Sequence, residues 1–376
     1  MGSPTFPIPP ASPRALLVTP TWPSAALSTL SPPAVVDTRG AVRKLATTPH
    51  PNGDGRVDVA VAYTPAREAY EAAAIPSAAF LDWTVDVNAR GGKGLPRDAA
   101  EALLASVGIT RGCDEDARGD ADDKVRAVVY DDGAMLFATR LWWMATRLGI
   151  SGVAVLDGGW TAWTAAGFPI EPGQAGAAAS AAASAAAVAQ RPPATTAADV
   201  ATVDAAVAAA AASLPLLTAD DVAAGLVDGG APPPTGTPRR RVLIDARSPM
   251  QYAGRERRGA RGGAIPGAVN LPYRALLGTG GVGLAQPPQL RGAFAAAGVA
   301  PLPPPKEGAR EGVTAHHGEG LSSPLPELSV YCNGGVASTV VIFCWVLLGG
   351  QGAANYGGSW NEWGARRDLP IVRGWV

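Results

Sequence analysis

The sequence predicts an α/β protein made of two tandem units of one design, each a mainly parallel sheet flanked by helices.

 Three observations support this class. Short β-branched runs alternate with apolar helical patterns of about ten residues, the order expected of parallel strands and their crossover helices. A set of motifs occurs twice in the same order. Between the two sets lies a segment of almost pure alanine, which has the composition of a linker.

Four motifs of the first half recur in the second half, and this repetition predicts a duplicated domain. The matched pairs are Val36-Asp37-Thr38-Arg39 with Ile244-Asp245-Ala246-Arg247, Ile75-Pro76-Ser77-Ala78 with Ile265-Pro266-Gly267-Ala268, Val129-Tyr130-Asp131 with Val330-Tyr331-Cys332, and Leu156-Asp157-Gly158-Gly159-Trp160 with Tyr356-Gly357-Gly358-Ser359-Trp360. We therefore expect an N-terminal non-catalytic domain over residues 14–172, an Ala-rich linker over 173–214 and a C-terminal catalytic domain over 215–376.

In the first half, apolar runs predict strands, and longer apolar patterns predict helices. Strands are expected at residues 16–19 (an edge strand), 35–39, 78–83, 125–130 and 153–156, and helices at 65–73, 96–107, 136–148 and just after 157–159. Pro65 suits a first helical position, because the N–H that proline lacks would have no partner there. The Pro- and Gly-rich residues 46–55 predict a loop.

In the second half, Thr218 to Asp221 resemble a capping box and predict the start of a helix. Strands are expected at 241–244 and 328–331, and a buried helix at 339–348. The tryptophans that recur in both halves are interpreted as core anchors. Arg39 and Arg247 end core strands and are predicted to form internal ion pairs.

The composition argues against several classes of function. The 31 Lys and Arg against 32 Asp and Glu give a net charge of −1, which does not favour nucleic-acid binding. Three cysteines without a CxxC pair, beside three histidines, predict no metal site and a reducing compartment. The longest apolar run is too short to cross a bilayer. We expect a soluble protein without a membrane partner, cytoplasmic or in an organelle such as a mitochondrion or chloroplast.

The stretch around Cys332 is the strongest candidate for chemistry. A predicted strand leads into this cysteine, and an apolar helix follows a short loop. The loop residues are Asn333, Gly334, Gly335, Val336 and Ala337. Amides of such a loop and the helix dipole favour the thiolate, which is the reactive form of cysteine. Glycines suit a loop wrapped around one sulfur atom, because it needs positive φ angles. The alternative is a buried core cysteine, which is the interpretation of Cys344.

The repeat also indicates which half carries the chemistry. The first half has Asp131 where the second half has Cys332. A carboxylate cannot replace a thiol nucleophile, so we expect a catalytic second half and a first half that serves as scaffold. Ligands of parallel sheets bind beyond the carboxyl ends of the strands, where Cys332 is expected to lie.

These motifs resemble those of the two-domain rhodanese family, the thiosulfate and 3-mercaptopyruvate sulfurtransferases. The matching motifs are the Asp-x-Arg strand ends, Ile-Pro-x-Ala, Leu-Asp-Gly-Gly-Trp, Tyr-Gly-Gly-Ser-Trp-Asn-Glu-Trp and the Cys-x-x-Gly-Val loop. The resemblance implies that Cys332 takes a sulfane sulfur from a small anionic donor and becomes a persulfide. It then passes the sulfur to cyanide, a thiol or a thioredoxin-like acceptor, with no cofactor and no metal.

The loop departs from both branches of that family. It lacks the cations that follow the cysteine in thiosulfate-preferring members and the hydroxyl groups of mercaptopyruvate-preferring members, so both donors remain open. Gln251 stands where the family has a donor-binding arginine. An arginine cluster follows at Arg255, Arg257, Arg258 and Arg261. Arg257 and Arg258 are predicted to bind the donor, because a guanidinium suits a carboxylate or thiosulfonate; the alternative is a solvated loop.

Two other functions use a reactive cysteine or a rhodanese-like fold. A cysteine phosphatase needs Cys-x5-Arg, but the sixth residue after Cys332 is Ser338, so this hypothesis is weak. The second is a rhodanese-like binding or redox-sensing module with little or no activity. The missing donor-site residues favour this module, whereas the retained thiol and glycine loop favour the enzyme.

Overall fold

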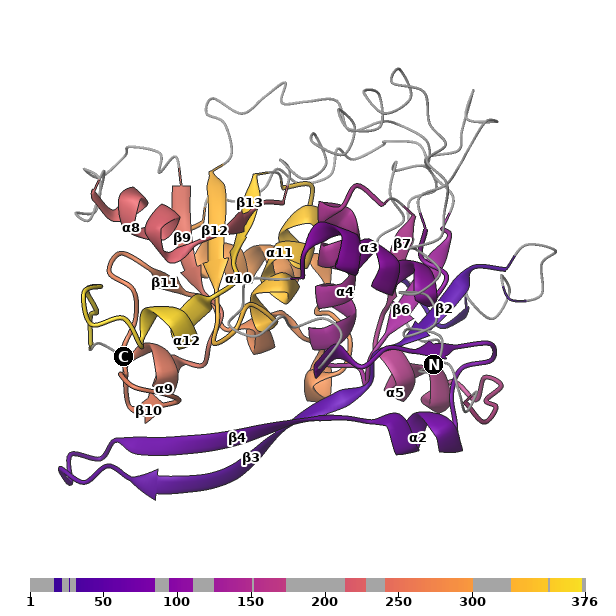
Figure 1. Cartoon of the computed structure of the whole chain (residues 1–376), viewed down its shortest axis with the longest axis horizontal. Coiled ribbons are helices and arrows are strands. Elements are labelled where there is room, and N and C mark those ends of the chain that lie inside the picture. The colour runs from indigo at the N-terminus through magenta and orange to yellow at the C-terminus, as the bar shows by residue number, and fades with distance from the viewer. Residues whose placement is uncertain are drawn as a thin grey trace, which may run out of the picture.

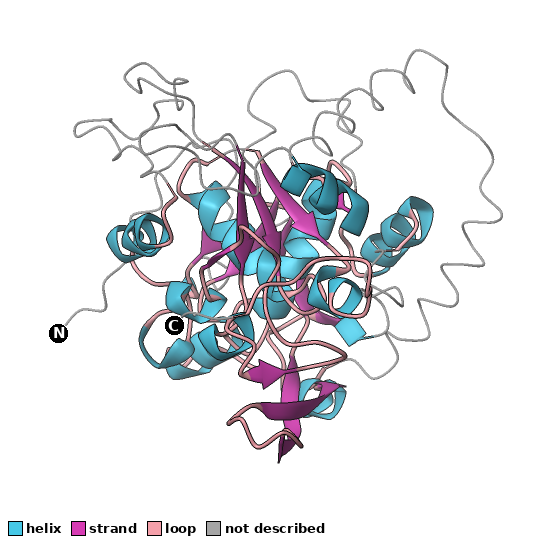
Figure 2. Ribbon diagram, turned by 90° about the vertical axis from the view of Figure 1, so that its left-hand side faces the viewer, coloured by secondary structure: helices cyan, strands magenta, loops and turns pink. Residues whose placement is uncertain are grey.

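The computed structural model describes residues 17–21, 27, 32–84, 95–110, 125–150, 152–173, 214–227, 241–299, 326–350 and 352–373. Each half contains one five-stranded parallel sheet flanked by helices, which confirms the predicted α/β class (Figure 1). Figure 2 shows helices on both sides of the strands. Of the linker expected at 173–214, residues 174–213 lie outside the described residues, as do residues 300–325 and Cys113. The domain boundaries therefore stay a prediction.

The two sheets have the same topology. The first has the order β1-β7-β6-β2-β5 and the second β8-β13-β12-β9-β11, read from the matching edge. The first sheet contains β1 (Leu17–Val18), β2 (Ala34–Asp37), β5 (Ala79–Phe80), β6 (Ala127–Tyr130) and β7 (Val153–Leu156). The second contains β8 (Leu216–Leu217), β9 (Arg241–Asp245), β11 (Val269–Asn270), β12 (Glu327–Tyr331) and β13 (Ala353–Tyr356).

The expected helices are all present, with small changes of their bounds. The first half has α2 (Arg67–Ala72), α3 (Arg97–Ser106), α4 (Leu136–Arg147) and α5 (Gly159–Ala165). The second half has α8 (Ala219–Val227), α9 (Pro249–Tyr252), α10 (Pro287–Ala296), α11 (Ala337–Leu347), α12 (Ser359–Trp363) and the 3-10 helices η3 (Tyr273–Leu276) and η4 (Thr279–Gly281). The capping box before α8 is confirmed, because Thr218 and Asp221 exchange hydrogen bonds of 2.8 and 3.2 Å.

The repeated motifs form the same internal contacts in both halves. Buried Arg39 pairs with Asp37 at 2.8 Å, and buried Arg247 pairs with Asp245 at 2.6 Å, as predicted. The Trp360 ring lies 4.3 Å from the Arg247 guanidinium carbon, as Trp160 does from Arg39 at 4.2 Å. The indole N–H groups of Trp163 and Trp363 each donate a 2.8 Å hydrogen bond to a proline carbonyl. The tryptophans therefore anchor the core, as expected.

A long hairpin includes residues 46–49, so that only residues 50–55 of the loop expected at 46–55 connect two strands. Strands β3 (Gly40–Pro49) and β4 (Val57–Pro65) pair in antiparallel fashion, and β10 (Glu256–Arg257) of the other half joins β4. Figure 1 shows this ribbon reaching beneath the C-terminal half as far as β10. Pro65 ends β4, so α2 begins two residues later than predicted. Most of β3 is exposed, and a partner distant in sequence completes the sheet, so local apolar patterning could not reveal it.

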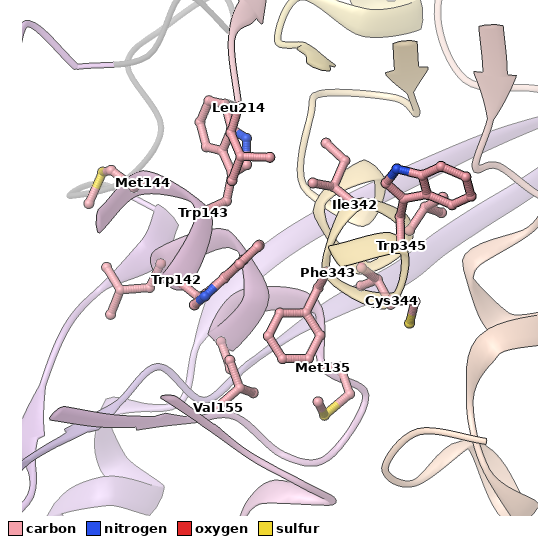
Figure 3. Packing of buried hydrophobic residues seen from close by; sticks show 14 of the residues in the cluster. Met135, Trp142, Trp143, Met144, Val155, Leu214, Ile342, Phe343, Cys344 and Trp345 are labelled. Atoms are coloured by element: carbon pink, nitrogen blue, oxygen red, sulfur yellow. The ribbon is translucent and has the colours of Figure 1, made fainter. Parts of the chain in front are cut away.

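Helices α4 and α11 join the two halves in one continuous apolar core. The Trp142 and Phe343 rings meet edge to face, with centroids 4.8 Å apart (Figure 3). The hydroxyl groups of Thr139 and Thr339 lie 3.1 Å apart in the same interface. None of the helices described is long and apolar enough to cross a bilayer. The packing of α4 on α11 brings the first half against the loop that precedes α11.

Candidate active site

Cys332 lies directly after β12, a central strand of the second sheet, at its carboxyl end. Its carbonyl oxygen accepts a 3.0 Å hydrogen bond from the Trp360 amide, and its own amide donates to Ser359 Oγ at 3.1 Å. Ala337, expected in the loop, is the first residue of α11. The residue Cys332 is buried, with 3% of its surface exposed. The backbone of the cysteine is thus fixed on both sides.

The two loop glycines have different roles. Gly335 has a φ of 77°, and a Cβ atom there would lie 2.9 Å from the carbonyl oxygen of Gly357. Gly334 is not in the positive-φ region, and a Cβ atom there would meet only the Asn361 side chain, at 3.3 Å. The expectation that both glycines provide positive φ angles is therefore wrong for Gly334. Only Gly335 requires glycine for its backbone geometry.

Gly335→Ala is expected to lower the free energy of unfolding by about 2 kcal/mol, because it adds a steric clash to an unfavourable φ angle. Gly334→Ala is the matched control and should change it by less than about 0.5 kcal/mol. Urea denaturation of both variants measures the difference. Equal losses in the two variants would show that the loop geometry has been misassigned.

The described contact of the Cys332 sulfur is with Ser338. The Ser338 Oγ atom lies 3.8 Å from Cys332 Sγ and donates a 2.8 Å hydrogen bond to Asn355 Oδ1. Asn355 Nδ2 in turn donates to the carbonyl oxygen of Gly335 at 3.0 Å. Within the described residues, no loop amide forms a hydrogen bond with this sulfur, which differs from the expected convergence of amides. Ser338 instead supplies a hydroxyl group that the loop itself lacks.

The matching loop of the first half holds a carboxylate in a nest of amides. Asp131 Oδ1 accepts from the amides of Gly133 and Met135 at 2.8 and 3.2 Å, and Oδ2 from those of Phe137 and Ala138 at 3.0 and 3.3 Å. Burial raises the pKa of Asp131, and these four amides act in the opposite direction. This type of loop can therefore surround an anion at the position that Cys332 occupies in the second half.

The arginine cluster does not form one clamp. Arg257 makes two 2.6 Å hydrogen bonds to the Asp58 carboxylate and so docks the hairpin. Arg261 donates to backbone carbonyls of residues 363, 364, 366 and 369. Arg255 is exposed, and Arg258 forms a single 3.2 Å contact with Glu256. Of the two arginines predicted to bind the donor, Arg258 is the one that is less firmly engaged.

A short polar network connects Arg258 to the cysteine loop. Glu256 Oε1 accepts from Arg258 and, at 2.6 Å, from Gln251 Nε2. Gln251 Oε1 then accepts from Asn333 Nδ2 at 3.0 Å. Gln251 stands where the family that this sequence resembles has an arginine. Its side chain is buried and links Glu256 to Asn333 without carrying a charge.

Two tyrosines near the sulfur were not indicated by the sequence pattern. Although 45% of the Tyr63 surface is exposed, partial desolvation raises the pKa of this tyrosine, the nearby Cys332 adds to this, and Arg258 lowers it. Burial also raises the pKa of Tyr273, with smaller contributions that include Cys332 and Arg258. Tyr63 comes from β4 of the first half and Tyr273 from η3 of the second, so residues of both halves lie within electrostatic range of the cysteine. Arg258 lies within electrostatic range of both tyrosines.

No group of residues in the described part of the chain has the arrangement of a metal site. Cys344, by contrast with Cys332, is fully buried on α11, and burial raises the pKa of its thiol well above the usual range. It is therefore a core residue, as the sequence predicted.

Comparison with known proteins agrees with this architecture. The rhodanese-like domain family matches residues 50–166. The 3-mercaptopyruvate sulfurtransferase of Escherichia coli K12 is 28% identical over 247 residues, which are 65% of this chain and 66% of that protein. The mitochondrial thiosulfate/3-mercaptopyruvate sulfurtransferase 1 of Arabidopsis thaliana is 27% identical over 308 residues, 80% of this chain and 68% of that protein.

The fold is also that of a solved structure. The crystal structure of SseA from Escherichia coli superposes with a TM-score of 0.55 at 19% identity, over 92% of this chain and 99% of that one. Residues 50–166 therefore carry a rhodanese-like domain, and the similarity to the named sulfurtransferases extends over 65–80% of the chain.

Proposed function

We propose that the protein is a sulfurtransferase of the thiosulfate/3-mercaptopyruvate type and that Cys332 carries the sulfur. The position of Cys332 is the main support: it follows a central parallel strand, in a loop whose counterpart encloses the Asp131 carboxylate with four amides. The names of the curated relatives support the same reaction class.

The reaction proceeds in two displacements. The Cys332 thiolate attacks the sulfane sulfur of the donor, so a sulfur–sulfur bond forms and the bond to the rest of the donor breaks. Thiosulfate releases sulfite with the bonding electron pair, and 3-mercaptopyruvate releases the enolate of pyruvate, which takes up a proton. A thiolate or cyanide then attacks the outer sulfur of the persulfide, and the Cys332 thiolate leaves.

Intact-mass measurement after mixing with thiosulfate or 3-mercaptopyruvate tests this proposal. The mass should increase by one sulfur atom, located at Cys332 by peptide mapping, and cyanide should remove it as thiocyanate. If neither donor adds sulfur, the alternative remains: a rhodanese-like module that binds a partner or senses redox state.

Arg258→Ala is expected to raise KM for an anionic donor about tenfold with little change in kcat, because it removes a charge-assisted contact. Arg258 is preferred over Arg257, whose guanidinium is held by Asp58. Arg255→Ala is the matched control, since this exposed arginine lies in the same segment. Steady-state kinetics with both donors gives KM and kcat. An unchanged KM for both donors in Arg258→Ala would remove this residue from the site.

A further inference from the structure

Arg140 is a buried guanidinium without a carboxylate partner among the described residues. It lies on α4 of the first half with 3% of its surface exposed, and its Nε atom makes no hydrogen bond there. The other buried arginines described, Arg39 and Arg247, each pair with an aspartate. Burial of an unpaired charge is costly, so its presence requires a physical reason.

The contacts of Arg140 lead to the cysteine loop. Its Nη1 atom donates a 3.1 Å hydrogen bond to the carbonyl oxygen of Gly335, the loop glycine that also accepts from Asn355. Its guanidinium carbon lies 4.7 Å from the centroid of the Trp143 ring on the same helix. The packing of α4 against α11 holds this contact in place (Figure 3). A residue of the first half therefore fixes a peptide of the loop in the second half.

The contact has a consequence for the direction of that peptide. In a trans peptide the C=O and the following N–H point in opposite directions. Two donors on the Gly335 oxygen therefore fix the direction of the Val336 N–H as well. Arg140 thus orients the Val336 amide indirectly, through its hydrogen bond to the Gly335 carbonyl.

The charge of Arg140 also acts on the sulfur. Burial lowers the pKa of Arg140 to about 10, and the neighbouring Cys332 raises it. This attraction is mutual, so the guanidinium favours an anion at the sulfur. Tyr63 and Tyr273 also interact with Cys332, but their raised pKa values leave them neutral near pH 7. Arg258, in the loop after β10, lies within electrostatic range of the two tyrosines and lowers their pKa values.

We propose that Arg140 is a positioning residue of the Cys332 loop: it holds the Gly335 carbonyl and places a buried cation beside the thiolate and the persulfide. The half without a nucleophile then contributes directly to the reactivity of the other half. The proposal rests on the proposed function for its purpose, although its test needs no sulfur donor.

A purely structural role of Arg140 and the proposed positioning role predict different effects of its replacement on protein stability. If Arg140 only supported packing, replacing it would destabilise the fold. If Arg140 instead serves to stabilise an anion at the sulfur, its replacement by methionine removes a buried charge that has no ion-pair partner among the described residues. The melting temperature of the variant should then stay the same or rise.

The test is the rate at which iodoacetamide alkylates Cys332, followed by peptide mass spectrometry as a function of pH. Arg140→Met is expected to react about tenfold more slowly near neutral pH, with a profile displaced to alkaline pH. Arg140→Gln, which keeps a hydrogen-bond donor but not the charge, should show the same displacement. Arg140→Lys should remain near the wild type.

Arg147→Met is the matched control. Arg147 lies on the same helix, and its guanidinium carbon is 5.7 Å from the same Trp143 ring, so its loss should leave the alkylation profile unchanged. Profiles of Arg140→Met and Arg140→Gln that coincide with the wild type would overturn the proposal. If Arg140→Met does not fold, Arg140→Gln decides by the same criterion.

The two proposals can fail separately. A wild-type protein that accepts no sulfur, combined with displaced profiles in the Arg140 variants, would reject the sulfurtransferase and retain the role of Arg140. Persulfide formation in all variants, combined with unchanged alkylation profiles, would support the sulfurtransferase and reject the role of Arg140.

Discussion

Replacement of Cys332 by serine is expected to abolish sulfur transfer, with a loss of at least about 10³-fold in kcat/KM. A serine hydroxyl stays protonated near neutral pH and cannot form a persulfide, whereas a thiol supplies a thiolate. The measurement is thiocyanate formation from cyanide with thiosulfate and with 3-mercaptopyruvate as donors. Intact mass should show no added sulfur in the serine variant.

Cys344→Ala is the control for this result. Cys344 lies on α11 within the common core, and its buried thiol, with a raised pKa, has little thiolate at neutral pH. The variant should keep activity within about twofold of the wild type, because it removes a small apolar group from a site that carries no chemistry. Equal losses in Cys332→Ser and Cys344→Ala would contradict the assignment of the nucleophile.

The repeat explains why the fold could be predicted from sequence. Paired motifs such as Asp37 to Arg39 and Asp245 to Arg247 encode the same buried ion pair at matching strand ends. The hairpin β3–β4 could not be predicted in this way. The Asp58 carboxylate that docks it pairs with Arg257, 199 residues further along the chain, and no local pattern contains such a partner.

The candidate site could be predicted only in part. The strand–Cys–Gly pattern located Cys332, because a tight loop before a helix has a local signature. Tyr63 and Arg140 come from the other half of the chain, so no spacing relative to the cysteine indicates them. Asn355 could be noticed in the sequence as an amide in an otherwise apolar strand, and the structure shows that it is buried. Arg257 was predicted to bind the donor because of its positive charge, but its guanidinium is hydrogen-bonded to Asp58.

Asp131→Ala is expected to lower the free energy of unfolding by about 4 kcal/mol, the largest loss of stability expected of a single change at either loop. Four buried amides lose their acceptor, at about 1 kcal/mol for each hydrogen bond. The loop wraps closely around the carboxylate, so water has little access to these amides. Urea denaturation measures the loss.

Asp132→Ala is the neighbouring control. Asp132 is exposed, and its carboxylate accepts one described hydrogen bond, from the amide of Gly40 at 3.1 Å, so its removal should cost less than about 1 kcal/mol. A loss in Asp131→Ala no greater than in Asp132→Ala would show that the four amides do not depend on the carboxylate. A large loss would show that the Asp131 carboxyl group holds the loop of the first half closed. In the second half the same position holds the sulfur atom of Cys332, and the proposed function requires this atom to accept a second sulfur and release it.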